Sequence, residues 1–168
     1  MVEVIQHPDI DSQLIPILDQ VSDPEIPVLT ILDMGVVRYA RMINDKVIVK
    51  ITPTYSGCPA MDTIAEDIVT AFNESEIEAE VQFLLAPAWT TDWISEKGRK
   101  ALEKYGIAPP LEAGADKEVL LGNKKHVKCT LCGSNNTRLI SQFGSTACKA
   151  LLQCEDCKEP FDYFKCLK

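Results

Sequence analysis

Four cysteines arranged in two pairs constrain this chain more than any other feature. Two residues separate Cys129 from Cys132 and Cys154 from Cys157, and 21 residues lie between the pairs. Each pair can form a tight turn whose two sulfurs reach one ion, and two such turns give tetrahedral coordination by four sulfurs. The spacing predicts a structural Zn²⁺ site. Mononuclear iron or an iron–sulfur cluster is an alternative occupant, because soft thiolates bind these too.

The segment around these cysteines needs the metal in order to fold. Residues 125–168 are too few to build a comfortable hydrophobic core of their own. Metal binding supplies about 10 to 16 kcal/mol to peptide-sized zinc modules at neutral pH. We therefore predict a β-rich zinc ribbon with four cysteine ligands over 125–168, with short strands at 137–142, 148–153 and 161–166, and an unfolded tail without metal.

A second candidate site is the turn that precedes Cys58. Residues 46–52 alternate like a strand buried on one face, and an apolar helical period begins at Met61. Pro59 suits the first helical position and puts Cys58 at the helix cap, where the dipole favours a thiolate. Cys58 is thus a candidate reactive thiol or metal ligand. An unreactive cysteine packed at the strand end is the alternative.

The remaining segments predict a small α+β fold over residues 1–110. Residues 1–10 form an untied leader, and a short helix follows a cap at Asp11 or Ser12. Further strands are expected at 36–42 and 79–85, and a second long helix begins near Thr91 or Asp92 and ends at Gly106. Together they predict a three-stranded mixed sheet with helices on one face. Residues 111–124 contain Pro, Gly and acidic residues without a periodic stripe, so we expect a linker there.

Composition excludes several classes of function. No apolar run approaches the roughly 20 residues that span a bilayer, and the N-terminus lacks the basic segment and apolar core of a signal peptide, which predicts a cytoplasmic protein. In that reducing compartment, the seven cysteines indicate metal or redox chemistry rather than disulfides.

Charge is distributed unevenly along the chain. Residues 1–123 carry 9 basic and 21 acidic side chains, a net −12, while residues 124–168 carry 8 and 4, a net +4. The acidic majority argues against general nucleic-acid binding, although the basic tail keeps a nucleic-acid-binding ribbon as a minor alternative.

The other cysteines and the two histidines support no catalytic site. Cys148 and Cys166 fall outside the paired spacing and could be buried apolar residues, a second soft-metal or redox pair, or ligands to a delivered group. His7 belongs to the leader, and His126 is expected to be solvated or orienting. The sequence contains no Glu-x-x-His pair for a di-iron oxygenase and no Gly-rich phosphate loop.

Several motifs resemble known families. The first 110 residues resemble the MIP18-like family (domain of unknown function 59) of iron–sulfur assembly factors. The motifs that match are Asp23-Pro24-Glu25-Ile26-Pro27, Asp33-Met34-Gly35-Val36-Val37, Thr52-Pro53-Thr54 and Cys58-Pro59. The tail resembles the D-protein family of bacterial phenylacetate-degradation operons, which is associated with the phenylacetyl-CoA ring epoxidase. Its motifs are Cys129-x-x-Cys132-Gly133, the run 143–151 and the run 159–166.

These resemblances imply an accessory maturation factor rather than an enzyme. Cys58 matches the family's reactive cysteine, and the implied role is to equip the oxygenase with its metal centres, most directly the iron–sulfur cluster of its reductase. Thr52, Thr54 and Ser56 would supply polar hydrogen bonds near Cys58. One thiolate cannot hold a cluster, so a homodimer, a small thiol, a partner protein, or Cys148 and Cys166 must complete the ligation. A non-enzymatic adaptor or subunit of the oxygenase is the competing hypothesis.

Overall fold

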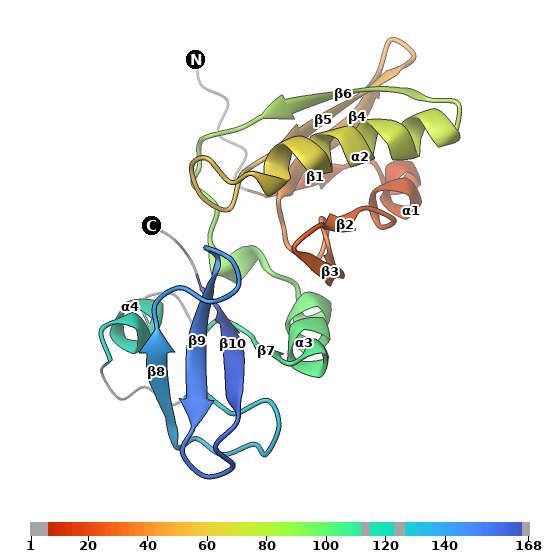
Figure 1. Cartoon of the computed structure of the whole chain (residues 1–168). Helices are drawn as coiled ribbons and strands as arrows, with labels where there is room; N and C mark the ends of the chain where they lie inside the picture. Colours follow the sequence, from red (N-terminus) through yellow and green to blue (C-terminus); the bar gives the residue numbers. More distant parts are fainter. Residues whose placement is uncertain (1–6, 112–114, 123–126, 166–168) are drawn as a thin grey trace. The chain divides into compact units, whose positions relative to one another are not determined.

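The computed structural model describes residues 7–111, 115–122 and 127–165 (Figure 1). The chain divides into two compact units, Met1–Trp89 and Thr90–Lys168. Within these described ranges, no helix has both the length and the apolar character needed to cross a bilayer.

The first unit is a mixed sheet with a long helix on one face. Its elements are β1 Asp9–Ile10, the 3₁₀ turn Ser12–Leu14, α1 Ile15–Leu18, β2 Ser22–Asp23, β3 Ile26–Thr30, β4 Val37–Ile43, β5 Lys46–Ile51, α2 Ala60–Glu74 and β6 Glu78–Phe83. The main sheet has the order β1-β4-β5-β6, and β2 pairs with β3 separately. β4 and β5 are antiparallel, whereas β1 is parallel to β4 and β6 is parallel to β5. The predicted α+β class is confirmed, with four strands in the sheet instead of three.

The fourth strand comes from the segment predicted to be an untied leader, so that prediction is wrong for Asp9 and Ile10. Asp9 pairs with Tyr39 of β4, and Nε of Arg41 donates to the Asp9 carboxylate at 3.0 Å. The backbone N–H of Asp11 continues the pairing by donating to the Ala40 carbonyl at 2.9 Å. A two-residue strand is too short to leave a periodic pattern in the sequence.

The core of this unit lies between the sheet and α2. Val47, Val49 and Ile51 alternate along β5 and are fully buried, as are Ile64, Ile68 and Phe72 of α2. Apolar residues recur every second residue in β5 and about every 3.6 residues in α2, so each element has one apolar face. These two faces pack against each other. A tight hairpin turn joins β4 to β5, and in it Asn44 and Asp45 both adopt positive φ.

The second unit contains a four-stranded sheet with three short elements around it. Its elements are the 3₁₀ turn Thr91–Trp93, α3 Glu96–Tyr105, β7 Ile107–Ala108, α4 Ala115–Leu120, β8 Thr137–Ser141, β9 Lys149–Cys154 and β10 Pro160–Phe164. The strand order is β7-β10-β9-β8, antiparallel except for the pairing of β7 with β10. The three predicted ribbon strands are confirmed, and β7 adds a strand that the sequence pattern did not indicate.

The described residues on either side of position 110 belong to the second unit. The division into compact units falls between Trp89 and Thr90, whereas the predicted boundary lay at residue 110. β7 joins the ribbon sheet through the pairing of Ile107 with Asp162. The predicted linker 111–124 contains α4, and its Val119 is buried in the ribbon core. A helix of under two turns shows too short a stripe to be recognised in the sequence.

The start of α3 also differs from the prediction. Thr90 caps the 3₁₀ turn by accepting from the Asp92 N–H, and Ser95 caps α3 by accepting from the Gly98 N–H at 2.9 Å. The helix therefore begins later than the expected cap at Thr91 or Asp92. Its end is confirmed, because Gly106 has a φ of 95° in the left-handed region.

We expect the Ile68→Ala variant to lower the free energy of unfolding of the first unit by about 3 kcal/mol, because it leaves a cavity between α2 and the sheet. Urea unfolding followed through the buried indole of Trp89, in a Trp93→Phe background, measures this change. The control Glu66→Ala on the exposed face of α2 should change stability by no more than about 0.5 kcal/mol. Equal effects of the two variants would contradict the assigned core.

Candidate functional site

The two cysteine pairs meet at one end of the ribbon. All four sulfurs, from Cys129, Cys132, Cys154 and Cys157, lie within 4.8 Å of one another. The Cys129 and Cys157 sulfurs are 3.8 Å apart, and those of Cys132 and Cys154 are 3.6 Å apart. Four sulfurs at about 2.3 Å from a zinc ion form a tetrahedron with edges of about 3.8 Å. The spacing of the sulfurs therefore fits a tetrahedral metal ion.

Backbone conformation turns each pair of sulfurs toward the common centre. The first turn ends in Gly133 with a φ of 75°, and the second ends in Lys158 with a φ of 66°. Backbone N–H groups then donate to the sulfurs: Ser134 to Cys132 and Glu159 to Cys157. Such donors stabilise thiolates and orient them for a cation.

Two of the thiols differ strongly in acidity. Hydrogen bonds from the backbone N–H of Cys157, and to a lesser extent of Asp156, lower the pKa of Cys154 to about 7. The Glu159 N–H lowers the pKa of Cys157, but burial and hydrogen bonds with the other three thiols outweigh it and raise that pKa to about 12. A divalent cation bound by four thiolates must therefore displace protons from the cluster.

A polar brace joins the two turns. The Asp156 carboxylate accepts hydrogen bonds from the Ser134 hydroxyl and, at 2.9 Å, from the Asn136 side-chain amide. The Glu155 N–H donates to the Asn136 carbonyl at 2.8 Å. Hydrogen bonds from Ser134, and then Asn136, lower the pKa of Asp156, so the brace stays ionised near neutral pH. These residues were not predicted, because nothing in their spacing marks them as partners.

The site is continuous with the core of the ribbon. Cys129 and Cys154 are buried and pack in the same cluster as Leu152, Phe161 and Tyr163. Cys132 is exposed and Cys157 is half-buried. The metal site therefore has a closed inner side and an open outer side. Its four protein sulfurs would fill a tetrahedral coordination shell, as in a structural rather than a catalytic centre.

Cys58 lies in the first unit, at the entrance to α2. Its N–H donates to the Tyr55 carbonyl at 3.3 Å, and its carbonyl accepts from the Met61 N–H at 3.2 Å. Pro59 is the cap residue and α2 begins at Ala60, so the prediction that Cys58 itself caps the helix is wrong by one residue. Pro59 already has helical backbone angles and takes the cap position, one residue after Cys58. The thiol is half-buried and stands just before the helix N-terminus.

The polar residues predicted around Cys58 differ in exposure. Thr52 is buried, and its N–H donates to the Val36 carbonyl at 2.8 Å. Within the described part of the chain, the Thr52 hydroxyl has no hydrogen-bond partner. Thr54 is half-buried, and Ser56 is exposed. The loop thus gathers these residues between β5 and α2, and their hydrogen bonding to Cys58 stays a prediction.

Cys148 is separate from both sites. It is buried just before β9, the strand whose far end carries Cys154, and its sulfur is 3.1 Å from the Thr146 hydroxyl. Its carbonyl accepts from the Lys165 N–H at 2.9 Å. The Lys165 ammonium donates to the Gln142 carbonyl, and burial lowers its pKa. Burial agrees with a packing role for Cys148, whereas Cys166 and His126 lie outside the described residues.

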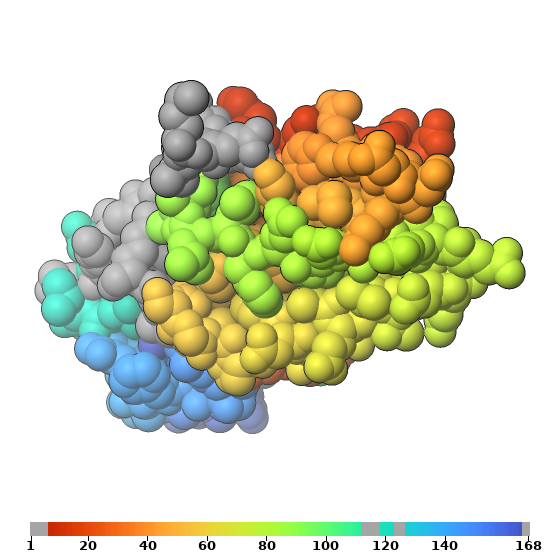
Figure 2. Space-filling model, turned by 90° about the horizontal axis from the view of Figure 1, so that it is seen from above, coloured from red at the N-terminus to blue at the C-terminus, as the bar shows by residue number. Residues whose placement is uncertain are grey.

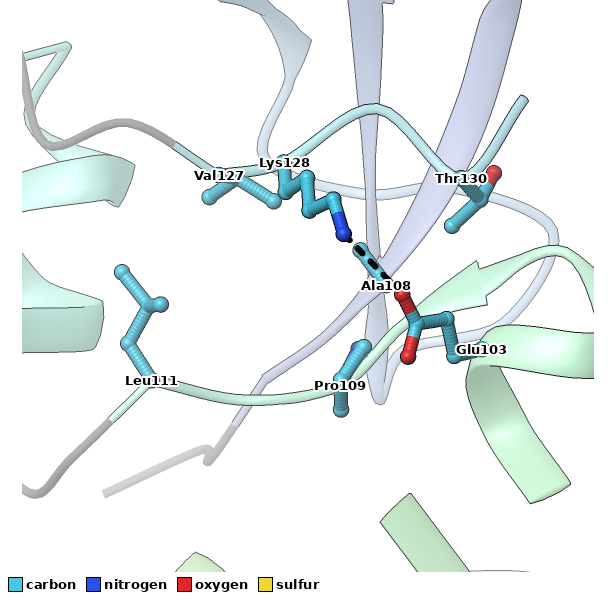
Figure 3. A pocket seen from close by; sticks show the side chains of 7 residues that line it. All are labelled: Glu103, Ala108, Pro109, Leu111, Val127, Lys128 and Thr130. Atoms are coloured by element: carbon cyan, nitrogen blue, oxygen red, sulfur yellow. Dashed lines mark ion pairs between the residues drawn. The ribbon is translucent and has the colours of Figure 1, made fainter. Parts of the chain in front are cut away.

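A hollow of about 120 Å³ lies beside β7 in the second unit (Figure 3). Lys128 and Glu103 point toward each other across it, with Nζ and Oε1 3.8 Å apart. Thr130 and apolar side chains make up the rest of its lining. Glu103 is its single carboxylate and it contains no cysteine or histidine, so this lining does not assemble catalytic groups.

Comparison with known proteins agrees with both units. Residues 11–83 match the family described as "Iron-sulfur cluster assembly protein", and residues 113–165 match the "PaaD zinc beta ribbon domain". The chain belongs to the family of iron–sulfur cluster assembly proteins that carry this zinc ribbon. The resemblances drawn from its motifs are thereby confirmed.

Two individual proteins illustrate this membership. The chain is 47% identical over 152 residues to an Escherichia coli (strain K12) protein whose name describes it as a putative subunit of 1,2-phenylacetyl-CoA epoxidase, and the match covers 90% of each chain. It is also similar to the crystal structure of a domain of unknown function, DUF59, from Bacillus anthracis. That match has 29% identity and a TM-score of 0.50, and it covers 54% of this chain and 88% of the other.

We expect removal of the metal by a chelator to unfold the second unit and leave the first unit folded, because the sulfurs are part of the ribbon core. Amide hydrogen exchange measures this separately for each sheet. Protection in β8, β9 and β10 should be lost, while protection in β4 and β5 should persist. A metal-free protein with a protected ribbon would contradict the assigned role of the site.

We further expect Asp156→Ala to weaken zinc binding by about ten-fold or more, because it releases the brace between the two turns. Competition with a chromophoric chelator measures the change. Glu155→Ala is the matched control, since it removes the same charge from the same turn but breaks ion pairs with Arg138 and Lys158 only. If both variants weaken zinc binding equally, charge rather than the brace is responsible.

Proposed function

We propose that this protein is a cytoplasmic, non-catalytic maturation factor that assists assembly of the iron–sulfur cluster in a phenylacetyl-CoA epoxidase complex. The observation that carries this proposal is the half-buried Cys58 at the entrance to α2, inside the segment that matches iron–sulfur cluster assembly proteins. The iron–sulfur reductase of the complex is the proposed recipient. The name of the E. coli relative supports the link to the epoxidase.

In this proposal Cys58 is a transient ligand to iron or a cluster, which is cargo rather than a resident cofactor. The Cys58 thiol stands just before the N-terminus of the 15-residue helix α2, and cysteine sulfur is a ligand that soft metals prefer. Its partial exposure leaves the sulfur accessible to a donor and a recipient. One sulfur leaves the remaining coordination positions open, so a second copy, a small thiol or the recipient supplies the other ligands.

The ribbon has a different role from Cys58 in this proposal. Four protein sulfurs fill the coordination of a zinc ion and leave no open position for chemistry. The ribbon would therefore hold a fixed surface that docks the recipient. Among the cysteines that the structure describes, transfer itself would use Cys58 alone, because Cys148 is buried in the second unit.

A stoichiometric subunit or adaptor is the second candidate function. The word "subunit" in the name of the E. coli relative favours it. In that case the protein would remain bound to the purified epoxidase complex, and Cys58 would be replaceable without effect.

We expect Cys58→Ser to lower the iron and acid-labile sulfide content of the recipient reductase several-fold in cells, because the transient ligand is lost. Metal and sulfide analysis of the purified reductase measures the result. Cys148→Ser is the matched control, since it changes a thiol outside both sites. The zinc content of both variants should stay near one ion per chain.

Iron and sulfide on the protein itself give a second measurement. Protein purified without oxygen should carry iron and sulfide in the wild type and lose them in Cys58→Ser. Unchanged cluster content of the reductase with Cys58→Ser would contradict the maturation role. Stable co-purification with the complex in the same strain would then establish the adaptor.

A further inference from the structure

The strand β6 forms a long open edge of the first unit's sheet. In the order β1-β4-β5-β6 it is the last strand, and within the described residues it pairs only with β5. Figure 2 shows its yellow-green atoms as a continuous surface band between the orange strands and the yellow helix α2. An exposed edge of this length can accept another strand.

The N–H and C=O groups of successive β6 residues point alternately toward β5 and away from it, and those pointing away are available to bind another strand. The Leu84 N–H donates to the Ile51 carbonyl at 2.8 Å, and Ile51 is paired in register with Phe83. In a parallel pair, every second residue directs its N–H and C=O to the neighbour. The even-numbered residues of β6 therefore bond to β5. Ala79, Val81 and Phe83 direct their N–H and C=O groups outward.

Side chains give the two faces of the edge opposite characters. On the face that carries α2, Val81 is half-buried, Phe83 is 47% exposed and Leu85, just beyond the strand, is 78% exposed. On the other face stand Glu78 and Glu80, which share the single ammonium of Lys46 at 3.2 and 3.0 Å. Two carboxylates therefore face one cation at this end of the edge, because the next lysine on this face, Lys50, is paired with Gln82 farther along and lies over the Tyr39 ring.

The surroundings extend this negative charge. The stretch 60–83, which spans α2 and β6, contains acidic residues and no lysine or arginine. Its acidic residues are Asp62, Glu66, Asp67, Glu74, Glu76, Glu78 and Glu80. A strand added here meets apolar side chains on one face and carboxylates on the other.

Pairing of this edge with the β6 strand of a second copy of the chain is electrostatically unfavourable. Two copies related by a two-fold axis would pair β6 with β6 in antiparallel fashion. In the register centred on Ala79, Glu78 of each copy would stand directly opposite Glu80 of the other, and other registers would keep the four carboxylates on the same face. Like charges directly opposite each other across a strand pair are destabilising.

We propose that the edge of β6 binds an extended segment of a partner protein as an added strand, in which lysine or arginine alternates with apolar residues. The backbone groups of Ala79, Val81 and Phe83 supply its hydrogen bonds. Basic side chains of the segment meet Glu78 and Glu80 on one face, and apolar ones cover the α2 side.

The position of this edge relates it to Cys58. β5 and β6 are parallel, so β6 ends at the same end of the sheet as β5, where the loop to Cys58 begins (Figure 1). A segment bound along β6 therefore runs toward the Cys58 loop. Identifying the partner as the recipient of a cluster rests on the proposed function, whereas the docking itself does not.

The probe is a blocked synthetic peptide, Lys-Val-Lys-Ile-Lys-Val-Lys, added to the full-length zinc-loaded protein. Amide exchange at the outward N–H groups of Ala79, Val81 and Phe83 should slow by about ten-fold or more. The N–H groups of Glu80 and Gln82, already bonded to β5, should gain no comparable protection. The same peptide with glutamate in place of lysine should not bind.

Two sets of variants sharpen this test. Val81→Pro removes one outward N–H without removing a bond to β5, and it should abolish binding, while Val81→Ala should retain it. Persistent protection of Gln82 and Leu84 shows that the strand remains folded. The double variant Glu78→Lys and Glu80→Lys should reverse the preference, so that the glutamate peptide binds and the lysine peptide does not.

Specific results would overturn this inference. Unchanged exchange at all three outward amides under millimolar peptide would do so. Protection of these amides that rises with protein concentration in the absence of peptide would instead assign the edge to a second copy. The Cys58→Ser variant should bind the peptide normally. Failure of the wild-type protein to bind the peptide would refute this inference and leave the proposed function untouched. An unchanged cluster content of the recipient in the Cys58→Ser strain would refute the proposed function and leave this inference untouched.

Discussion

The packing of α2 across β5 and β6 is the interaction on which the first unit depends. Because the helix connects two parallel strands, it must start at the end of the sheet where both strands end. That requirement places Cys58 just after the carboxyl end of β5, and because β4 occupies the other side of β5, β6 becomes the edge strand. The helix packs on the sheet through three fully buried side chains, Ile64, Ile68 and Phe72. The thiol and the open edge are thus two results of one crossover connection.

The second unit has a small core, and two of its cysteines serve both as metal ligands and as core residues. Cys129 and Cys154 are ligand atoms and also members of the ribbon's apolar core. Coordination and packing therefore form together, and each makes the other favourable. The segment 90–111 enlarges this core from outside the ribbon motif, since β7 extends the sheet and Ala108 packs within it.

The sequence predicted those features that rest on local patterns. The cysteine spacing located all four sulfurs, and the change of period after β5 located α2 and its preceding thiol. Features that depend on pairing with distant residues were missed, such as the two-residue strands β1 and β7. The brace of Asp156, Ser134 and Asn136 was missed for the same reason, because its members meet only after both turns have formed.

The uneven exposure of the four sulfurs has a kinetic consequence. Cys132 is open to solvent, whereas Cys154 on the same ion is fully enclosed. A competing ligand would reach a bound ion most readily from the side of Cys132, the most exposed of the four, so exchange of the metal would begin with detachment of that sulfur. The lifetime of a bound ion would therefore be governed by the exposed sulfur of Cys132, while its affinity would be shared by all four sulfurs.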